Sequence, residues 1–230
     1  DVAKDAADVV LLEKDLGVLA RGVSHGRKVF NNTMKYVLMG TAGDFGNLFS
    51  AALGTMVLPF LPMAPGQVLL QDLMYDSSQL AIPTDNVDPE QVARPSHWRI
   101  SYIRKFMLVF GLASSLFDFM TFGLMLFVFH AKENEFHTGW FVESLATATL
   151  IGFAIRTRRV PFLRSRPSLG LLASISLIVI VGSWLPYSPL SAVLGFTPLP
   201  PLFFLALAAM VAGYMVLAEI AKLRLFRQDA

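Results

Sequence analysis

Acidic side chains interrupt the most apolar parts of this 230-residue chain, and their spacing is suited to binding a cation. Asp72 and Asp76 are four residues apart in the segment LLQDLMYDSSQL, and Asn47 follows Asp44 by three residues in an earlier apolar segment. Spacings of three and four residues place side chains on one face of a helix. A carboxylate at the centre of a membrane costs about 3 kcal/mol, so such groups usually face a partner or an ion path. Tyr75 precedes Asp76 and offers a further oxygen.

The chemistry that these side chains favour is the binding of a hard cation. Oxygen ligands without sulfur or imidazole favour magnesium, calcium, sodium or a proton over zinc or copper. No Lys or Arg occurs between positions 36 and 93, so the negative charge requires protonation or a bound cation. The absence of cysteine excludes disulfides, zinc–thiolate sites and thiol catalysis. The sequence also lacks a phosphate-binding glycine loop, a nucleophile elbow and an HExxH motif, so we assign no catalytic residue.

Three further acidic residues fall inside apolar segments. For Asp118, the sequence is equally compatible with a structural and a functional role. Glu143 lies near the expected outer boundary of its segment. A solvated position at the membrane interface fits it at least as well as a role as a cation ligand. Glu219 is expected at the inner interface, paired with Lys222. The four histidines do not show a metal-ligand spacing, and we assign them no role.

Composition indicates that these residues belong to a helical membrane protein. Hydrophobic residues make up 54% of the chain and the mean hydropathy is +0.56, values too apolar for a soluble domain. A helix of about 20 apolar residues crosses about 30 Å of hydrocarbon. The expected fold class is therefore all-α, a bundle of six transmembrane helices at about 35–59, 65–83, 104–130, 138–156, 168–187 and 199–221. Residues 1–33 are expected to precede the membrane domain of residues 34–230 as a charged soluble segment.

The distribution of basic residues supports six spans that begin on the cytoplasmic side. Of the 19 Lys and Arg residues, all except Lys132 fall in segments that this topology places in the cytoplasm. The positive-inside rule requires such an asymmetry. Omitting the second span would invert every later loop and remove the asymmetry.

Helix geometry predicts that the polar residues of the first two spans lie at matching depths. With a rise of about 1.5 Å per residue, Asp44 lies about 14 Å from Lys35 along the first helix. Asp76 lies the same distance from Asp85 along the next, antiparallel helix. The sequence therefore predicts two adjacent levels of oxygen ligands between these helices, formed by Asp44, Asn47, Asp72 and Asp76.

The order of motifs along the whole chain resembles that of P-type ATPases. The segment DVAKDAADVVLLEKDLGVLARGVSHGRKVFNNTMKYV is similar to the end of that family's phosphorylation domain, continuing through the stalk into the fifth membrane helix. The segments GDFGNLFS and LLQDLMYDSSQL resemble the fifth and sixth helices. Further details resemble the magnesium-transporting P3B branch, the MgtA/MgtB type: PFLPM, FMLVFGLASSLFDFMTFGLM, GWFVESL, IRTRRVPF and PLPP.

The resemblance implies a C-terminal fragment of a larger pump. Its six spans would be helices five to ten of ten, and residues 1–33 would be the C-terminal end of the phosphorylation domain and the stalk. The phosphorylated aspartate, the nucleotide site and the fourth helix would lie outside this chain. The branch commonly has Asn at the positions of Asp44 and Asp72, which leaves the identity and number of ions open. The metal ligands that the resemblance implies are Asp44, Asn47, Asp72, Tyr75 and Asp76.

The function that the resemblance implies is ATP-driven Mg²⁺ import across the bacterial plasma membrane, with both ends of the chain in the cytoplasm. Mg²⁺ would be the transported ion and would also accompany ATP in the missing domains. The implied partners are the lipid bilayer and the missing N-terminal half of the same polypeptide, with its actuator, nucleotide-binding and phosphorylation domains. Nucleic acid is not expected, because the basic residues form no continuous stripe. The alternatives are a P-type ATPase for calcium or protons, and a passive cation channel or membrane scaffold.

Overall fold

Helices form the architecture of the computed structural model, which describes residues 2–8, 10 and 15–227. The predicted all-α class is confirmed, and no strand element occurs in the described part of the chain. Some residues of the N-terminal motif and the last three residues lie outside that part. In chain order the elements are α1 Val2–Asp5, α2 Leu16–Val57, α3 Pro65–Gln79, η1 Ile82–Thr84, α4 Pro89–Ala93, α5 Ile100–Gly123, η2 Leu124–Val128, α6 Glu133–Leu150, α7 Gly152–Ile155, α8 Leu169–Trp184, η3 Leu185–Tyr187, α9 Ser191–Leu194 and α10 Pro201–Arg227.

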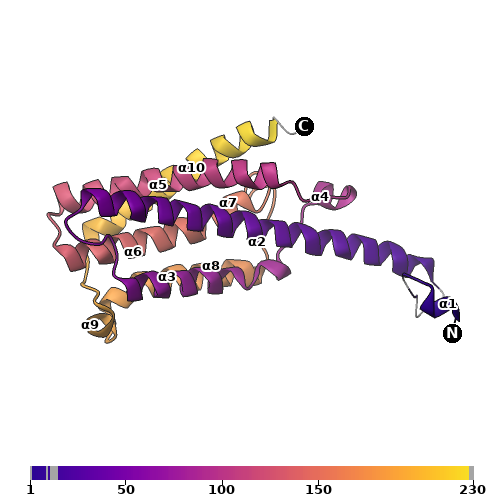
Figure 1. Ribbon diagram of the computed structural model, residues 1–230, viewed down its shortest axis with the longest axis horizontal. Helices are drawn as coiled ribbons and strands as arrows, with labels where there is room; N and C mark the ends of the chain where they lie inside the picture. The colour runs from indigo at the N-terminus through magenta and orange to yellow at the C-terminus, as the bar shows by residue number, and fades with distance from the viewer. Residues whose placement is uncertain (1, 9, 11–14, 228–230) are drawn as a thin grey trace.

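Helix α2 is a single helix of 42 residues. It begins after Asp15, whose side chain accepts a hydrogen bond from the backbone N–H of Gly17 at 2.8 Å. At about 1.5 Å per residue it is about 63 Å long, roughly twice the thickness of the hydrocarbon core. Its N-terminal part extends beyond the bundle, whereas its C-terminal part lies along the other long helices (Figure 1). The predicted soluble segment and the first predicted span are therefore joined without a break in the helix.

Helix α3 returns antiparallel to α2 after a turn that contains Pro59 and Pro62. Its 15 residues span about 22 Å, less than the roughly 30 Å of a hydrocarbon core. The predicted second span, 65–83, is therefore divided into α3 and the short 3₁₀ helix η1. Pro83 lies within η1 and marks the point where a regular α-helix cannot continue.

Within the described part of the chain, four helical segments are long and apolar enough to cross a membrane. They are Ile100–Val128, Glu133–Ile155, Leu169–Tyr187 and Pro201–Leu225. These segments match the last four predicted spans. The C-terminal part of α2 and helix α3 do not meet the same criteria of length and composition, so their crossing stays a prediction.

Helix α6 lies at the centre of the bundle. It packs against α2, α3, α5, α8 and α10, and 94% of its most apolar stretch is buried. The corresponding stretches of α8 and α10 are only 28% buried and present apolar side chains such as Leu177 and Leu205 outward, as lipid-facing helices do. The wetted position considered for Glu143 is wrong. Helix α6 begins at Glu133, earlier than expected, so Glu143 is deep in the bundle and fully buried.

Two glycines permit α2 and α5 to cross closely. A Cβ atom on Gly46 would lie 3.0 Å from the carbonyl oxygen of Gly111. A Cβ atom on Gly111 would lie 3.1 Å from the carbonyl oxygen of Ala42 and 2.6 Å from the ring of Phe45. Small residues at such crossings allow backbones to approach each other. The crossing fixes the height of α2 against α5, and therefore the height of Asp44, two residues before Gly46.

Candidate cation site

The α2–α3 hairpin places the three predicted carboxylates within electrostatic reach of one another. Asp72 and Asp76 on α3 both act electrostatically on Asp44 of α2, and Asp76 also acts on Asp72. All three carboxylates repel one another, and the strongest interactions of Asp44 and Asp72 include no basic group. The three residues are exposed on the surface of the hairpin, whereas Asn47 is half-buried. The hairpin therefore presents a concentrated negative charge on one open face.

These carboxylates form one side of a site and not a closed cage. Among the described residues, no group of three or more His, Cys, Asp or Glu side chains is close enough to hold a metal ion. Mg²⁺ requires near-octahedral oxygen coordination at about 2.1 Å, with retained water molecules completing the shell. A cation bound at this face would therefore need ligands from water or from another protein segment in addition to the hairpin.

Tyr75 lies in different surroundings from its acidic neighbours. Its hydroxyl donates a hydrogen bond of 2.8 Å to the main-chain oxygen of Met39 on α2, and its side chain is buried. The ring fits against α2 because Gly43 has no side chain: a Cβ atom there would lie 2.8 Å from the hydroxyl oxygen. Tyr75 therefore ties α3 to α2 directly beside Asp44, and its proton is already committed to this contact.

Asn47 is oriented by a polar bridge that sequence reasoning did not identify. The hydroxyl of Ser144 on α6 donates to the amide oxygen of Asn47 at 2.8 Å, and the amide of Gln71 on α3 donates to the Ser144 oxygen at 2.7 Å. Ser144 thus connects α2, α3 and α6 at the level of the carboxylates. Nothing in the sequence marks Ser144 and Gln71 as partners, so only the packing reveals the bridge.

Asp118 and Glu143 form a second acidic group inside the bundle. Both side chains are fully buried, and their carboxyl groups interact directly with each other. The oxygens of Asp118 accept hydrogen bonds from the hydroxyl of Ser50 at 2.6 Å and from the indole N–H of Trp140 at 2.8 Å. The sequence left the role of Asp118 open, and the structure places it between α2, α5 and α6.

Glu219 has the partner that the sequence predicts. Its carboxylate accepts a hydrogen bond of 2.6 Å from the ammonium group of Lys222, one turn later on α10. The Lys222 side chain is buried and also donates to the main-chain oxygens of Ala154 and Arg159. The pair therefore joins α10 to the loop after α7.

A buried ion-pair cluster occupies the end of the bundle where the basic loops gather. Asp85 accepts hydrogen bonds from the ammonium of Lys35 and the guanidinium of Arg156, each at 2.7 Å. Burial by itself raises the pKa of the Asp85 carboxyl, but the hydrogen bonds from Arg156 and Lys35 outweigh it and hold the pKa below its ordinary value. Asp85 therefore ties α2, the segment after α3 and the loop after α7 together.

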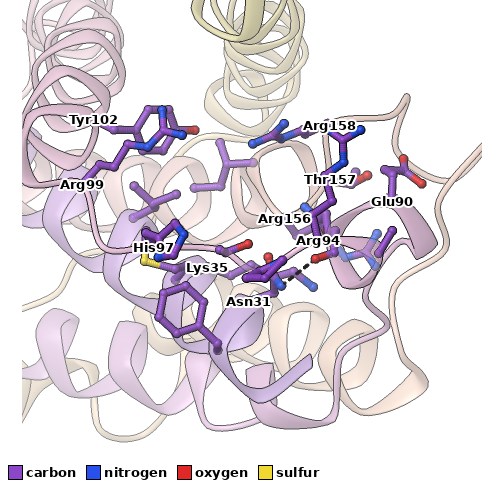
Figure 2. A pocket seen from close by; sticks show the side chains of 18 residues that line it. Asn31, Lys35, Glu90, Arg94, His97, Arg99, Tyr102, Arg156, Thr157 and Arg158 are labelled. Carbon is purple, nitrogen blue, oxygen red and sulfur yellow. Dashed lines mark hydrogen bonds between the residues drawn. The ribbon is translucent and has the colours of Figure 1, made fainter. Parts of the chain in front are cut away.

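A cavity of about 610 Å³ adjoins this cluster. Asn31 and Lys35 of α2 line it, and arginines from both basic loops surround it (Figure 2). Arg27 donates to the main-chain oxygens of Val92 and Ala93, and Asn31 donates to that of Gln91. The part of α2 that precedes the membrane region is therefore attached to the segment that follows α3.

The fold combines a long helix that enters the bundle, an acidic hairpin formed by the C-terminal part of that helix and α3, and four apolar helices, as the membrane part of an ion-transporting ATPase does. The family model for the C-terminal region of cation-transporting ATPases matches residues 60–224, and the chain belongs to this family. The resemblance seen in the sequence is thereby confirmed.

Curated relatives give a narrower comparison. The chain is 48% identical over 226 residues to a magnesium-transporting ATPase, P-type 1, of Escherichia coli (strain K12), and 47% identical over 226 residues to one of Salmonella typhimurium (strain LT2). Each match covers 96% of this chain and 25% of the relative. A calcium-transporting ATPase 1 of Bacillus cereus is 26% identical over 141 residues, which are 60% of this chain and 15% of that protein. The chain thus spans about a quarter of the length of its magnesium-transporting relatives.

Proposed function

We propose that this chain forms part of the cation pathway of a P-type ATPase that imports Mg²⁺ across the bacterial plasma membrane. The observation that carries the proposal is the α2–α3 hairpin, on which Asp44, Asp72 and Asp76 act electrostatically on one another, and the groups that act most strongly on Asp44 and Asp72 include no basic residue. The 47–48% identity to magnesium-transporting ATPases supports Mg²⁺ as the ion. Both ends of the chain lie in the cytoplasm in this proposal, because the basic loops gather at the end of the bundle that α2 enters.

In the proposed site, Asp44, Asn47, Asp72 and Asp76 provide ligands for the ion or for its retained water molecules. Tyr75 serves chiefly as a strut between the two helices, since its hydroxyl already donates to Met39. The family resemblance implies Asn at the positions of Asp44 and Asp72 in the magnesium-transporting branch, so this site would be more strongly charged than that pattern. The extra charge is expected to strengthen the attraction for a partly dehydrated divalent cation.

The proposed coupling uses the continuity of α2. ATP hydrolysis takes place in cytoplasmic domains of the full-length protein, where Mg²⁺ also accompanies ATP, and their movement is passed to the N-terminal part of α2. Asn32 and Lys35 bond to the segment after α3, so a displacement of α2 reaches both helices of the hairpin. Transport requires that the site bind the ion with different affinities in two states. A shift of Asp44 and Asn47 against Asp72 and Asp76 would supply that difference.

Growth of a bacterium that lacks its own magnesium uptake systems tests this function. The full-length ATPase containing this chain is expected to restore growth at limiting Mg²⁺, and Asp76→Asn is expected to abolish that rescue. Ser77→Ala is the matched control, because among the described residues the Ser77 hydroxyl bonds within its own helix, to the oxygen of Leu73 at 2.7 Å. Both variants are quantified in isolated membranes, so that loss of insertion is separated from loss of transport.

Two results would contradict the proposal in different ways. Wild-type rescue by Asp76→Asn would place the transport site elsewhere. An ATPase activity stimulated by Ca²⁺ at constant ATP–Mg²⁺, together with no rescue at limiting Mg²⁺, would identify the protein as a calcium pump.

A further inference from the structure

Asp118 and Glu143 form a buried acidic group in which the two carboxyls cannot both be ionised. Both side chains are fully buried, and two adjacent negative charges in an apolar bundle are strongly unfavourable. The groups that act most strongly on the two carboxyls are each other, Ser50, Trp140, Thr121 and Thr147, and none of them is basic. At least one proton must therefore reside on the pair.

The hydrogen-bond partners indicate which carboxyl holds that proton. Asp118 accepts from Ser50 and Trp140, one donor on each of its oxygens, as a carboxylate does. Neither oxygen of Glu143 has a hydrogen-bond partner among the residues that the structure describes. Thr121 and Thr147 lie nearby, but their hydroxyls donate to the sulfur of Met210 and to main-chain oxygens of α6. If Glu143 is protonated and donates to Asp118, Glu143 gains a hydrogen-bond partner and the Asp118 carboxylate gains a third donor.

The surroundings of the pair reach the candidate cation site by a short route. Ser50, which donates to Asp118, is three residues after Asn47 on α2. Ser144, which follows Glu143 on α6, donates to Asn47 itself. Helices α2 and α6 are thus joined at two successive levels, one through the carboxyl pair and one through the Asn47 amide. Tyr214 of α10 is a further titratable group close enough to interact with both carboxyls.

We propose that Asp118 and Glu143 share one proton throughout the transport cycle and act as a positioning pair that holds α2 against α5 and α6 one turn from Asn47. In this arrangement Glu143 is the donor, Asp118 is the acceptor, and neither is a ligand of the transported ion. The proposal rests on the proposed transport function for its readout, because the effect of the pair is measured through the ion dependence of the pump.

Two substitutions of Glu143 in the full-length ATPase test this proposal. Glu143→Gln retains a donor toward Asp118 in nearly the same shape, so ion-dependent ATPase activity in lipid vesicles is expected to stay within about twofold of wild type. Its half-saturating Mg²⁺ concentration and its pH profile are also expected to be unchanged. Glu143→Leu fills a similar volume without a donor and leaves Asp118 with two donors. It is expected to raise the half-saturating concentration by about tenfold, since Asn47 loses its fixed height.

The outcomes separate a positioning pair from other roles. A Gln variant that raises the half-saturating concentration as much as the Leu variant, or that changes the pH profile, would overturn the proposal, because Glu143 would then act as an ionised group. A Leu variant that lowers only its abundance in the membrane, with an unchanged half-saturating concentration, would also overturn it in favour of a purely structural role. If the wild-type pump responds to another cation, the magnesium assignment fails, and the same comparison is made with that cation.

Discussion

Replacement of Asp85 by Asn provides the most direct test of how the basic end of the bundle is held together. Both cations that Asp85 contacts are themselves buried: the side-chain exposures are 0% for Asp85, 6% for Lys35 and 1% for Arg156. The second carboxyl oxygen accepts a hydrogen bond of 3.0 Å from the backbone N–H of Ser168, the residue that caps α8. One carboxylate therefore bonds to two cations and joins three segments of the chain.

The expected cost follows from this burial. Asp85→Asn preserves the shape but removes the charge that bonds directly to two buried cations. Breaking a buried ion pair by removing one partner costs about 3–5 kcal/mol. We expect the free energy of unfolding of the membrane domain to fall by about this amount. Most of the loss is expected to come from the buried charges of Lys35 and Arg156, which would no longer be paired with the Asp85 carboxylate.

Thermal unfolding of the full-length ATPase in detergent, followed by the loss of the monodisperse peak in size-exclusion chromatography, is the assay. Glu90→Gln is the matched control, since Glu90 forms an equally short pair of 2.6 Å with Arg159 on the same loops. That pair is exposed and screened by solvent, so its loss is expected to have a much smaller effect. A shift for Asp85→Asn no larger than that for Glu90→Gln would refute the reasoning from burial.

The pH dependence of the same assay gives an independent check. The Arg156 and Lys35 contacts hold the pKa of Asp85 below its ordinary value. The ionised Asp85 therefore stabilises the folded state fully at pH values above the unfolded-state pKa of about 3.9. The stabilisation is lost as the pH falls through the lower pKa of the folded state. The difference in stability between wild type and Asp85→Asn should therefore be constant near neutral pH and should shrink under strongly acidic conditions. A difference that already shrinks between pH 8 and about pH 6 would contradict this assignment.

Two further substitutions test the packing around the hairpin. Gly46→Ala is expected to destabilise the protein by about 1–3 kcal/mol, because the new methyl group would lie 3.0 Å from the carbonyl oxygen of Gly111. Gly40→Ala should be neutral or slightly stabilising, because its methyl group would meet no atom of a neighbouring segment within 4 Å. Equal melting temperatures for the two variants would contradict the close crossing of α2 and α5. Tyr75→Phe removes the hydrogen bond to Met39 and is expected to lower the free energy of unfolding by about 0.5–1.5 kcal/mol, while the maximal transport rate stays nearly unchanged. A loss of transport at normal abundance would instead show that the Tyr75 oxygen contacts the ion.

The placement of the acidic hairpin is largely predictable from the sequence. Helical periodicity and the rise per residue are local properties, so the spacing of Asp44, Asp72 and Asp76 from the basic ends of their helices predicts their common level. Asp72 and Asp76 act electrostatically on Asp44, but their role as ion ligands stays a prediction. Mean hydropathy likewise identifies the last four apolar helices, which contain few charges and match the candidate membrane spans.

The surroundings of the individual polar groups are not predictable in the same way. Ser144 bridges Gln71 and Asn47, and Ser50 and Trp140 bind Asp118, across separations of 22 to 97 residues. Such contacts depend on which helix faces are turned toward each other, and hydropathy alone does not determine the rotation of a helix that is apolar on every side. The error over Glu143 has a different source: its distance from the apparent end of an apolar segment suggested a wetted position, whereas α6 begins earlier, at Glu133.

By itself, the sequence determined that this is a helical membrane domain, how its basic residues are distributed, and which acidic residues share a helix face, because these properties depend on composition and on local helix geometry. The tertiary structure alone decided that α6 is the central helix, that Tyr75 is a strut between α2 and α3, and that Asp118 and Glu143 meet in the interior. The physical reason is that burial and hydrogen-bond partnership are properties of packed neighbours. In an apolar bundle they are set by close contacts such as that of Gly46 with Gly111, which no local pattern specifies.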